Sequence, residues 1–157
     1  MIDSLNLLIN QLSTELSNSK KLIDVQYCLE EYNGDDWQQY IKFDDEKYHR
    51  QLIYHSDSFD LVIICWKYQQ KSQIHDHPDQ GCLMKILNGK LLENTYNNDK
   101  QLTYLSSIIL EKDAIGYKTG NCILHDIHCL EDTVSLHIYS PGGYQAHYYL
   151  NENSLQK

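Results

Sequence analysis

The apolar positions of the first 45 residues recur with the period of an α-helix. Leu5, Leu8 and Leu12 are three or four residues apart, so one face of a helix over this stretch would be apolar. Two shorter helical stretches follow, near residues 24–32 and near residues 36–41. We interpret residues 1–45 as a helical cap that covers one side of a sheet.

After residue 46 the segments become short and rich in β-branched and aromatic residues, which is typical of β-strands. Turn-forming residues separate them, and the pair Asn88-Gly89 between two apolar segments indicates a tight hairpin. Many short strands at this spacing favour a sandwich or a barrel. We expect strands over residues 49–55, 59–68, 73–77, 82–87, 90–96, 102–109, 114–117, 122–127, 133–139 and 145–150.

The two patterns together predict an all-β protein with a short helical lead-in. The barrel would occupy residues 46–157 and the helical cap residues 1–45. The length of 157 residues fits one domain, so we expect residues 1–157 to form a single unit. With 41% hydrophobic and 22% charged residues, such a chain can form a core without a metal or a disulfide.

Charge and cysteine content narrow the class of partner. The chain has 13 basic and 22 acidic residues, a net charge of −9, which disfavours nucleic acid and anionic membranes as partners. No apolar run approaches the roughly 20 residues of a membrane helix, and the N-terminus does not resemble a secretory signal. Five cysteines without a CxxC pair are typical of a reduced, cytoplasmic protein with mostly buried thiols. We expect a monomer.

The densest group of reactive side chains is a His-x-His pair, His75 and His77, with Asp76 between them. Residues two apart on a strand share a face, so the two imidazoles would point into one cavity and Asp76 away from it. Two imidazoles on one face supply two ligands of a metal site, although such pairs also occur by chance. A later strand would supply the third ligand. His125 is our first candidate because it lies within an apolar strand, and His128 is the alternative.

A second group lies on the strand expected over residues 133–139, which alternates completely. Ser135, His137 and Tyr139 share one face, and apolar residues share the other. The simplest interpretation is that the polar face is solvated. Inside a barrel, the same side chains could form a hydrogen-bond relay in which the imidazole orients the phenol.

Arg50 is the single arginine of the chain, and it lies near the start of the barrel region beside Tyr48. It is either a chance surface residue or, if it points into a cavity, a bidentate clamp for a carboxylate. An inward position would require such an anionic partner, because a buried unpaired charge is costly.

These residues resemble the signature of the cupins and, within them, that of the cysteine dioxygenase family. His75-x-His77 is followed after four residues by Cys82, where most cupins have glutamate, and after six more by Gly89. The resemblance covers residues 46–147. The similar segments are ICW at 64–66, IHDH at 74–77, CLMKILNG at 82–89 and VSLHIYSP at 134–141.

The resemblance implies a jelly-roll-like cupin barrel that holds Fe(II) through His75, His77 and His125. It implies L-cysteine and O2 as substrates and cysteine sulfinate as the product. In that family an arginine binds the substrate carboxylate, which implies this role for Arg50, with Tyr48 close to it.

The resemblance also implies roles for the alternating strand. Tyr139 would lie at the iron, with His137 and Ser135 behind it. A thioether bond would join Cys82 to Tyr139, and the peptide bond Ser140-Pro141 would be cis.

Other functions stay open at this stage. The protein could oxidise another small thiol, such as 3-mercaptopropionate or cysteamine, or it could be a catalytically inert cupin that binds a metabolite. A zinc or manganese cupin that acts as an isomerase or hydrolase is a further alternative. The combination of Arg50 with Cys82 favours cysteine, because relatives acting on 3-mercaptopropionate tend to have a glutamine for the arginine and to lack the cysteine.

Overall fold

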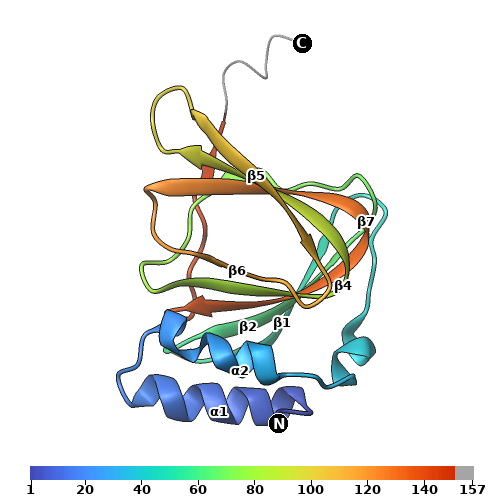
Figure 1. Cartoon of the computed structure of the whole chain (residues 1–157), viewed down its shortest axis with the longest axis vertical. Coiled ribbons are helices and arrows are strands. Elements are labelled where there is room, and N and C mark those ends of the chain that lie inside the picture. Colours follow the sequence, from blue (N-terminus) through green and yellow to red (C-terminus); the bar gives the residue numbers. More distant parts are fainter. Residues whose placement is uncertain (151–157) are drawn as a thin grey trace.

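The computed structural model describes residues 1–150 of the chain. These residues form a curled β-barrel with helices on one outer side (Figure 1). Residues 151–157, the end of the expected barrel, lie outside the described part. The helices are α1 (Leu5–Ser17), η1 (Leu22–Val25), α2 (Gln26–Glu31) and η2 (Asp36–Tyr40). The strands are β1 (His49–His55), β2 (Asp60–Trp66), β3 (Ile74–His75), β4 (Gly81–Asn97), β5 (Tyr104–Glu111), β6 (Ile115–Lys118), β7 (Ile123–Ser140) and β8 (Tyr148–Tyr149).

The helical cap lies against one outer face of the sheet, as its periodicity predicts (Figure 1). Ser4 begins α1, and its side chain accepts a hydrogen bond from the backbone N–H of Leu7. The buried face of α1 carries Leu5, Leu8 and Leu12. The helix expected near residues 24–32 is divided into a 3-10 turn, η1, and the short α2.

The long strands β4 and β7 form the frame of the barrel and pair antiparallel along nearly their whole length. The expected hairpin at Asn88-Gly89 is wrong: β4 continues through this pair, and the register shifts there instead. Gly89 has a φ of +95°, and an added Cβ would lie 2.3 Å from Oγ1 of Thr133. The Asn-Gly pair therefore makes a bulge at which β4 bends against β7, which lets both strands extend across the barrel.

Two expected strands are much shorter than their apolar patterns. β3 and β8 have two residues each, and they pair with each other. The next two backbone N–H groups show where the pairing with the segment of β8 ends: Asp76 still follows the β3–β8 register, and His77 leaves it. Asp76 N–H donates to the carbonyl of His147, and His77 N–H donates to the carbonyl of Gly120.

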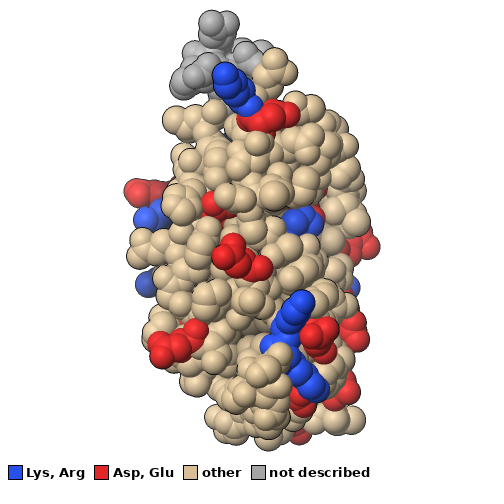
Figure 2. All heavy atoms as spheres, turned by 90° about the vertical axis from the view of Figure 1, so that its left-hand side faces the viewer, with Lys and Arg blue, Asp and Glu red and all other residues tan. Residues whose placement is uncertain are grey.

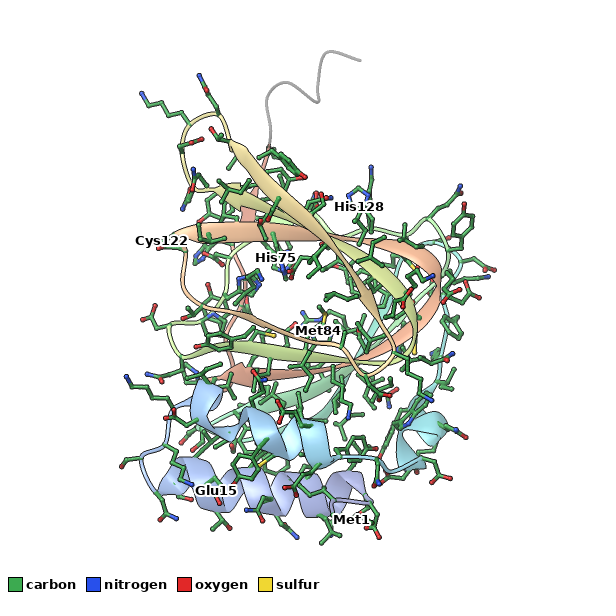
Figure 3. The ribbon with its side chains drawn as sticks, in the orientation of Figure 1. Met1, Glu15, His75, Met84, Cys122 and His128 are labelled. Atoms are coloured by element: carbon green, nitrogen blue, oxygen red, sulfur yellow. The ribbon has the colours of Figure 1, made fainter. Side chains whose placement is uncertain are left out.

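The β4–β7 pair has two different faces. One face packs against the helices through residues such as Leu83, Leu136 and Ile138, all fully buried. The opposite face points into the barrel, where Met84 joins a second apolar cluster (Figure 3). The site described below lies on this inner face.

The surface mixes charges of both signs. Figure 2 shows acidic and basic side chains interspersed on one face of the molecule, with no broad basic patch among the described residues of that face. Within residues 1–150, no helix combines the length and the apolar character needed to cross a membrane.

Candidate metal centre and substrate cavity

Three imidazoles from two distant parts of the chain meet inside the barrel. His75 on β3 and His125 on β7 are paired residues in adjacent strands, and His77 follows two residues after His75 on the same side. The Nε2 atom of His125 lies 2.9 Å from that of His77 and 3.0 Å from that of His75. Figure 3 shows His75 pointing into the interior. The strand pairing therefore brings together three nitrogen donors at one point.

The hydrogen-bond partners of the Nδ1 atoms, which face away from the cluster, show that the cluster fits a cation. Nδ1–H of His75 donates to the carbonyl of Gln73, and Nδ1–H of His125 donates to the carboxylate of Glu93, both at 2.8 Å. These bonds leave the Nε2 lone pairs of both rings facing one another, an arrangement that repels unless a positive ion lies between them. Nδ1 of His77 is buried and has no hydrogen-bond partner within residues 1–150.

Burial keeps the imidazoles of His75 and His77 neutral. It lowers the pKa of His75 to about 3, with a further contribution from the neighbouring His125, and lowers the pKa of His77 in the same way. Neutral imidazole is the form that binds metals, so these two rings are ready to act as ligands.

A buried ion pair supports the third imidazole. Glu93 on β4 is 3% exposed and accepts both the His125 ring N–H and the ammonium of Lys118, the latter at 3.0 Å. Burial alone would raise the pKa of Glu93, but these two partners outweigh it and lower that pKa. Glu93 is therefore a carboxylate that fixes the orientation of the His125 ring.

His128, the alternative third ligand, lies elsewhere. It is three residues beyond His125 on β7, and its Nε2 is 3.4 Å from Oδ1 of Asp126. Figure 3 shows it at the outside of the barrel, away from His75. The structure thus brings His125, and not His128, to the other two histidines.

The alternating face of β7 forms a hydrogen-bond relay and is not solvated. Trp66 Nε1–H donates to Ser135 Oγ at 2.9 Å, and Ser135 lies 2.8 Å from Nε2 of His137. The serine O–H then donates to Nε2, which leaves Nδ1–H of His137 directed at the Tyr139 oxygen, 3.4 Å away. The hydroxyl hydrogen of Tyr139 remains free for a group in the cavity.

Burial also sets the protonation state of this relay. It lowers the pKa of His137 well below its usual value, and the positive charge of Arg50 acts in the same direction. Burial raises the pKa of Tyr139 far above its usual value. Both side chains are therefore neutral at physiological pH, and Tyr139 can donate a hydrogen bond.

Cys82 lies beside Tyr139. The two are paired residues in β4 and β7, and the Cys82 sulfur is 3.9 Å from Nδ1 of His137. Burial raises the pKa of the thiol to about 12. The peptide bond Ser140-Pro141, just after Tyr139, is cis.

Arg50 and Tyr48 line the same cavity. The Arg50 guanidinium is 5.4 Å from the centre of the Tyr139 ring, although the residue as a whole is exposed. Tyr48 stacks on Trp66, with ring centres 4.3 Å apart. Arg50 is therefore both a surface residue and a lining residue, because it stands where the cavity opens to solvent.

Glu93, Lys118 and Trp66 belong to the site but were not predicted from the sequence. Glu93 had one usable signal: it lies in a strand at an even spacing from the apolar Leu91, on the side that faces inward. No comparable signal marks Lys118, because its contact with Glu93 depends on how β6 pairs with β4.

Solved structures with a similar fold include cupins. A Klebsiella pneumoniae protein with a double-stranded β-helix domain superimposes with a TM-score of 0.60 at 14% identity, covering 72% of this chain and 93% of that protein. An RmlC-like cupin from Desulfovibrio desulfuricans gives a TM-score of 0.51 at 20% identity, covering 64% of this chain and 89% of that protein. At these identities the likeness establishes the fold alone, and it confirms the predicted all-β cupin barrel.

Similarity in sequence is more specific. Cysteine dioxygenase type 1 from Danio rerio is 34% identical over 136 residues, which are 80% of this chain and 68% of that protein. The Homo sapiens protein of the same name is 33% identical over 128 residues, 75% of this chain and 64% of that protein. The chain therefore spans about two thirds of the length of these relatives. The family model for cysteine dioxygenase type I matches residues 3–152, and the chain belongs to this family.

Proposed function

We propose that the protein is an Fe(II)-dependent dioxygenase that oxidises L-cysteine with O2 to cysteine sulfinate. The observation that carries the proposal is the convergence of three imidazole Nε2 atoms, 2.9 and 3.0 Å apart, in a cavity that Arg50 and Tyr139 also line. Membership of the cysteine dioxygenase family supports the choice of reaction.

His75, His77 and His125 are the residues that would hold the iron. Because imidazole binds a metal in its neutral form, three histidine ligands would leave the ion its full positive charge, which attracts an anionic thiolate. When bound, Fe(II) supplies the redox chemistry that lets O2 react with the thiolate. The Glu93–Lys118 pair holds the His125 ring in place, so the three donors need little reorganisation.

Arg50 is the proposed binding group for the substrate carboxylate. Its planar guanidinium can donate two parallel hydrogen bonds to a carboxylate, which fixes both the distance and the orientation of the substrate. The anion also neutralises a charge that otherwise faces the cavity. Tyr48, held by its stack on Trp66, forms the adjoining wall. Clamping one end of cysteine directs its thiol toward the three imidazoles.

Tyr139 is the proposed hydrogen-bond donor at the reacting end. The relay through Ser135 and His137 leaves its hydroxyl hydrogen free, and its raised pKa keeps that hydrogen in place. In the overall reaction the thiolate RS⁻ takes up both atoms of one O2 to give RSO2⁻, so no other reductant is consumed. Because the Tyr139 hydroxyl keeps its proton, it can orient the reacting oxygen atoms through a hydrogen bond without protonating them.

We further propose a thioether between the Cys82 sulfur and a ring carbon of Tyr139. Their paired position on β4 and β7 supports it. One S–C bond replaces an S–H and a C–H bond, and O2 takes the two electrons and two protons. We expect an intact mass about 2 Da below that of the sequence after turnover, and none of this loss in Cys82→Ala. An unchanged mass after many turnovers would contradict the crosslink.

Oxygen uptake with two thiols tests the proposed function. We expect Arg50→Gln to reduce kcat/KM for cysteine by about 100-fold, in line with the loss of a charged bidentate contact. Turnover of cysteamine, which lacks the carboxylate, should change little. His49→Gln on the same strand is the matched control and should leave both substrates unaffected.

The other outcomes of this experiment separate the alternatives. Equal losses on both thiols would remove the carboxylate-binding role of Arg50 and favour another small thiol as substrate. No oxygen uptake with any thiol, in protein loaded with Fe(II), would favour an inert metabolite-binding cupin.

We also infer a cytoplasmic monomer with no nucleic-acid or membrane partner. The net charge of −9 and the absence of disulfides within residues 1–150 support the inference on compartment and partners.

A further inference from the structure

Asp76, the residue between the two histidines of the His-x-His pair, has an unusually complete set of partners. Its carboxylate is 4% exposed and accepts four hydrogen bonds. The Tyr144 hydroxyl (2.6 Å) and the His147 backbone N–H (2.8 Å) donate to Oδ1. The His147 ring (3.1 Å) and the Tyr149 hydroxyl (3.3 Å) donate to Oδ2. All four donors come from one segment, residues 144–149, which we call the wall segment.

The wall segment closes one side of the metal cavity. Tyr144, Ala146 and Tyr148 line the cavity together with the three histidines. The ring of Tyr148 lies 6.1 Å from that of His75, measured between ring centres. Besides the two-residue pairing of β8 with β3, one further backbone hydrogen bond joins the wall segment to the His-x-His strand, from Asp76 N–H to the His147 carbonyl. The Asp76 side chain is therefore the main polar attachment of this wall.

We propose that Asp76 is a positioning residue that couples metal binding to closure of the wall segment. Its backbone lies between two ligands, so any shift of Asp76 moves His75 and His77. Its carboxylate holds the wall, so any loosening of the wall frees Asp76. An ion that fixes the two imidazoles therefore also fixes the wall, and a detached wall weakens the ion's hold. The inference rests on the metal site of the proposed function but does not depend on oxidation of cysteine.

Fe(II) alone, added under nitrogen, tests the coupling through two readouts. The first is the Fe(II) dissociation constant, measured by competition with a coloured chelator. The second is hydrogen exchange of the backbone amides in residues 144–149. In the wild-type protein, Fe(II) should slow this exchange by about tenfold or more. The compared variant is Asp76→Asn, and the matched control is Asp79→Asn, an exposed aspartate three residues later.

We expect Asp76→Asn to raise the Fe(II) dissociation constant by about 10–100-fold, the usual effect of removing a group that orients metal ligands. Exchange in the wall segment should become about tenfold faster, because the amide removes the negative charge that faces all four donors and replaces one acceptor oxygen with an NH2 group. Asp79→Asn should change neither quantity. The proposal is overturned if Asp76→Asn behaves like Asp79→Asn, or if Fe(II) leaves exchange of the wild-type wall unchanged.

A second variant covers the case in which Asp76→Asn does not fold. The double variant Tyr144→Phe, Tyr149→Phe removes two donors and keeps the aspartate, so it should show the same two effects in smaller measure. Unchanged Fe(II) affinity and wall exchange in this variant would overturn the coupling. Fe(II)-dependent closure without cysteine oxidation would support the coupling and contradict the proposed function. Cysteine oxidation by a protein in which Fe(II) leaves exchange of the wall segment unchanged would support the proposed function and contradict the coupling.

Discussion

The two faces of the β4–β7 pair carry opposite chemistry, although one alternation of residues builds both. On the face toward the helices, Leu136 and Ile138 are fully buried in an apolar cluster. On the face toward the barrel interior, Ser135 and His137 are also buried, but every polar group in them is engaged in the relay. The polar face is shielded from water because the barrel encloses it. An alternating pattern alone therefore does not distinguish a solvated face from one that lines a functional site.

This comparison separates stability from function. The apolar face, packed against the cap, should determine the free energy of unfolding, and the inner face should determine metal binding. If the two faces are independent, a substitution on one face should leave the property set by the other unchanged.

The strongest test concerns the third imidazole on the inner face. His125→Ala should raise the Fe(II) dissociation constant by more than about 100-fold, because removing a metal ligand weakens binding more than removing a residue that only orients a ligand. His128→Ala, three residues along the same strand, is the matched control and should bind Fe(II) normally. Chelator competition measures both. Equal weakening in the two variants would show that the site is not assembled as described.

The next test removes packing from the opposite face. Leu136→Ala should lower the free energy of unfolding by about 2–5 kcal/mol, because it leaves a cavity in the cluster under the helices. Fe(II) affinity of the folded fraction should stay unchanged. Leu105→Ala on β5, where the leucine is 44% exposed, should cost little. Urea titration gives the stabilities, and a large loss of metal affinity in Leu136→Ala would join the two faces that we separate.

Lys85 is the polar exception on the apolar face. Its ammonium is buried and donates to the carbonyls of Leu29 and Tyr32, both at 2.7 Å, near the end of α2. Lys85→Met should lower the free energy of unfolding by about 1–3 kcal/mol, because two buried carbonyls lose their donor. Lys112→Met, at an exposed lysine, is the control. A stability equal to the wild type would mean that the carbonyls find other donors.

The smallest expected effect is a pH dependence from the cap side. Burial, and the hydrogen bond to Asp36, raise the pKa of Tyr32 above its usual value near 10. Above pH 10 the unfolded chain loses this proton and the folded chain keeps it, so stability falls as pH rises, by up to about 1.4 kcal/mol per pH unit. Tyr32→Phe should lose stability less steeply over the same range in urea titrations. Parallel profiles for the two proteins would assign the alkaline loss to other groups.

Local patterns were sufficient for much of this molecule. The leucine spacing predicted α1 and its buried face, and the change of period after residue 46 predicted the barrel. The two-residue spacing of His75 and His77 predicted that their rings share a side, because period two is a property of the strand itself.

The predictions that failed or stayed open depend on contacts between distant residues. Asn88-Gly89 suits a hairpin by local propensity, but its place opposite Thr133 makes it a bulge in a continuous strand. The sequence around Arg50 is compatible with a position at the mouth of a cavity and with a position on an open surface, so it could not distinguish the two. The support that Glu93 gives to His125 was likewise invisible before β4 was paired with β7.

By itself, then, the sequence determined the helical cap, the strand-rich barrel and the two imidazoles that project to one side. The tertiary structure decided that His125, and not His128, completes the cluster, and that the Ser135 face is enclosed. The reason is physical: side-chain direction within a strand follows from backbone geometry over a few residues, whereas register and closure depend on which distant strands pair and what they bury.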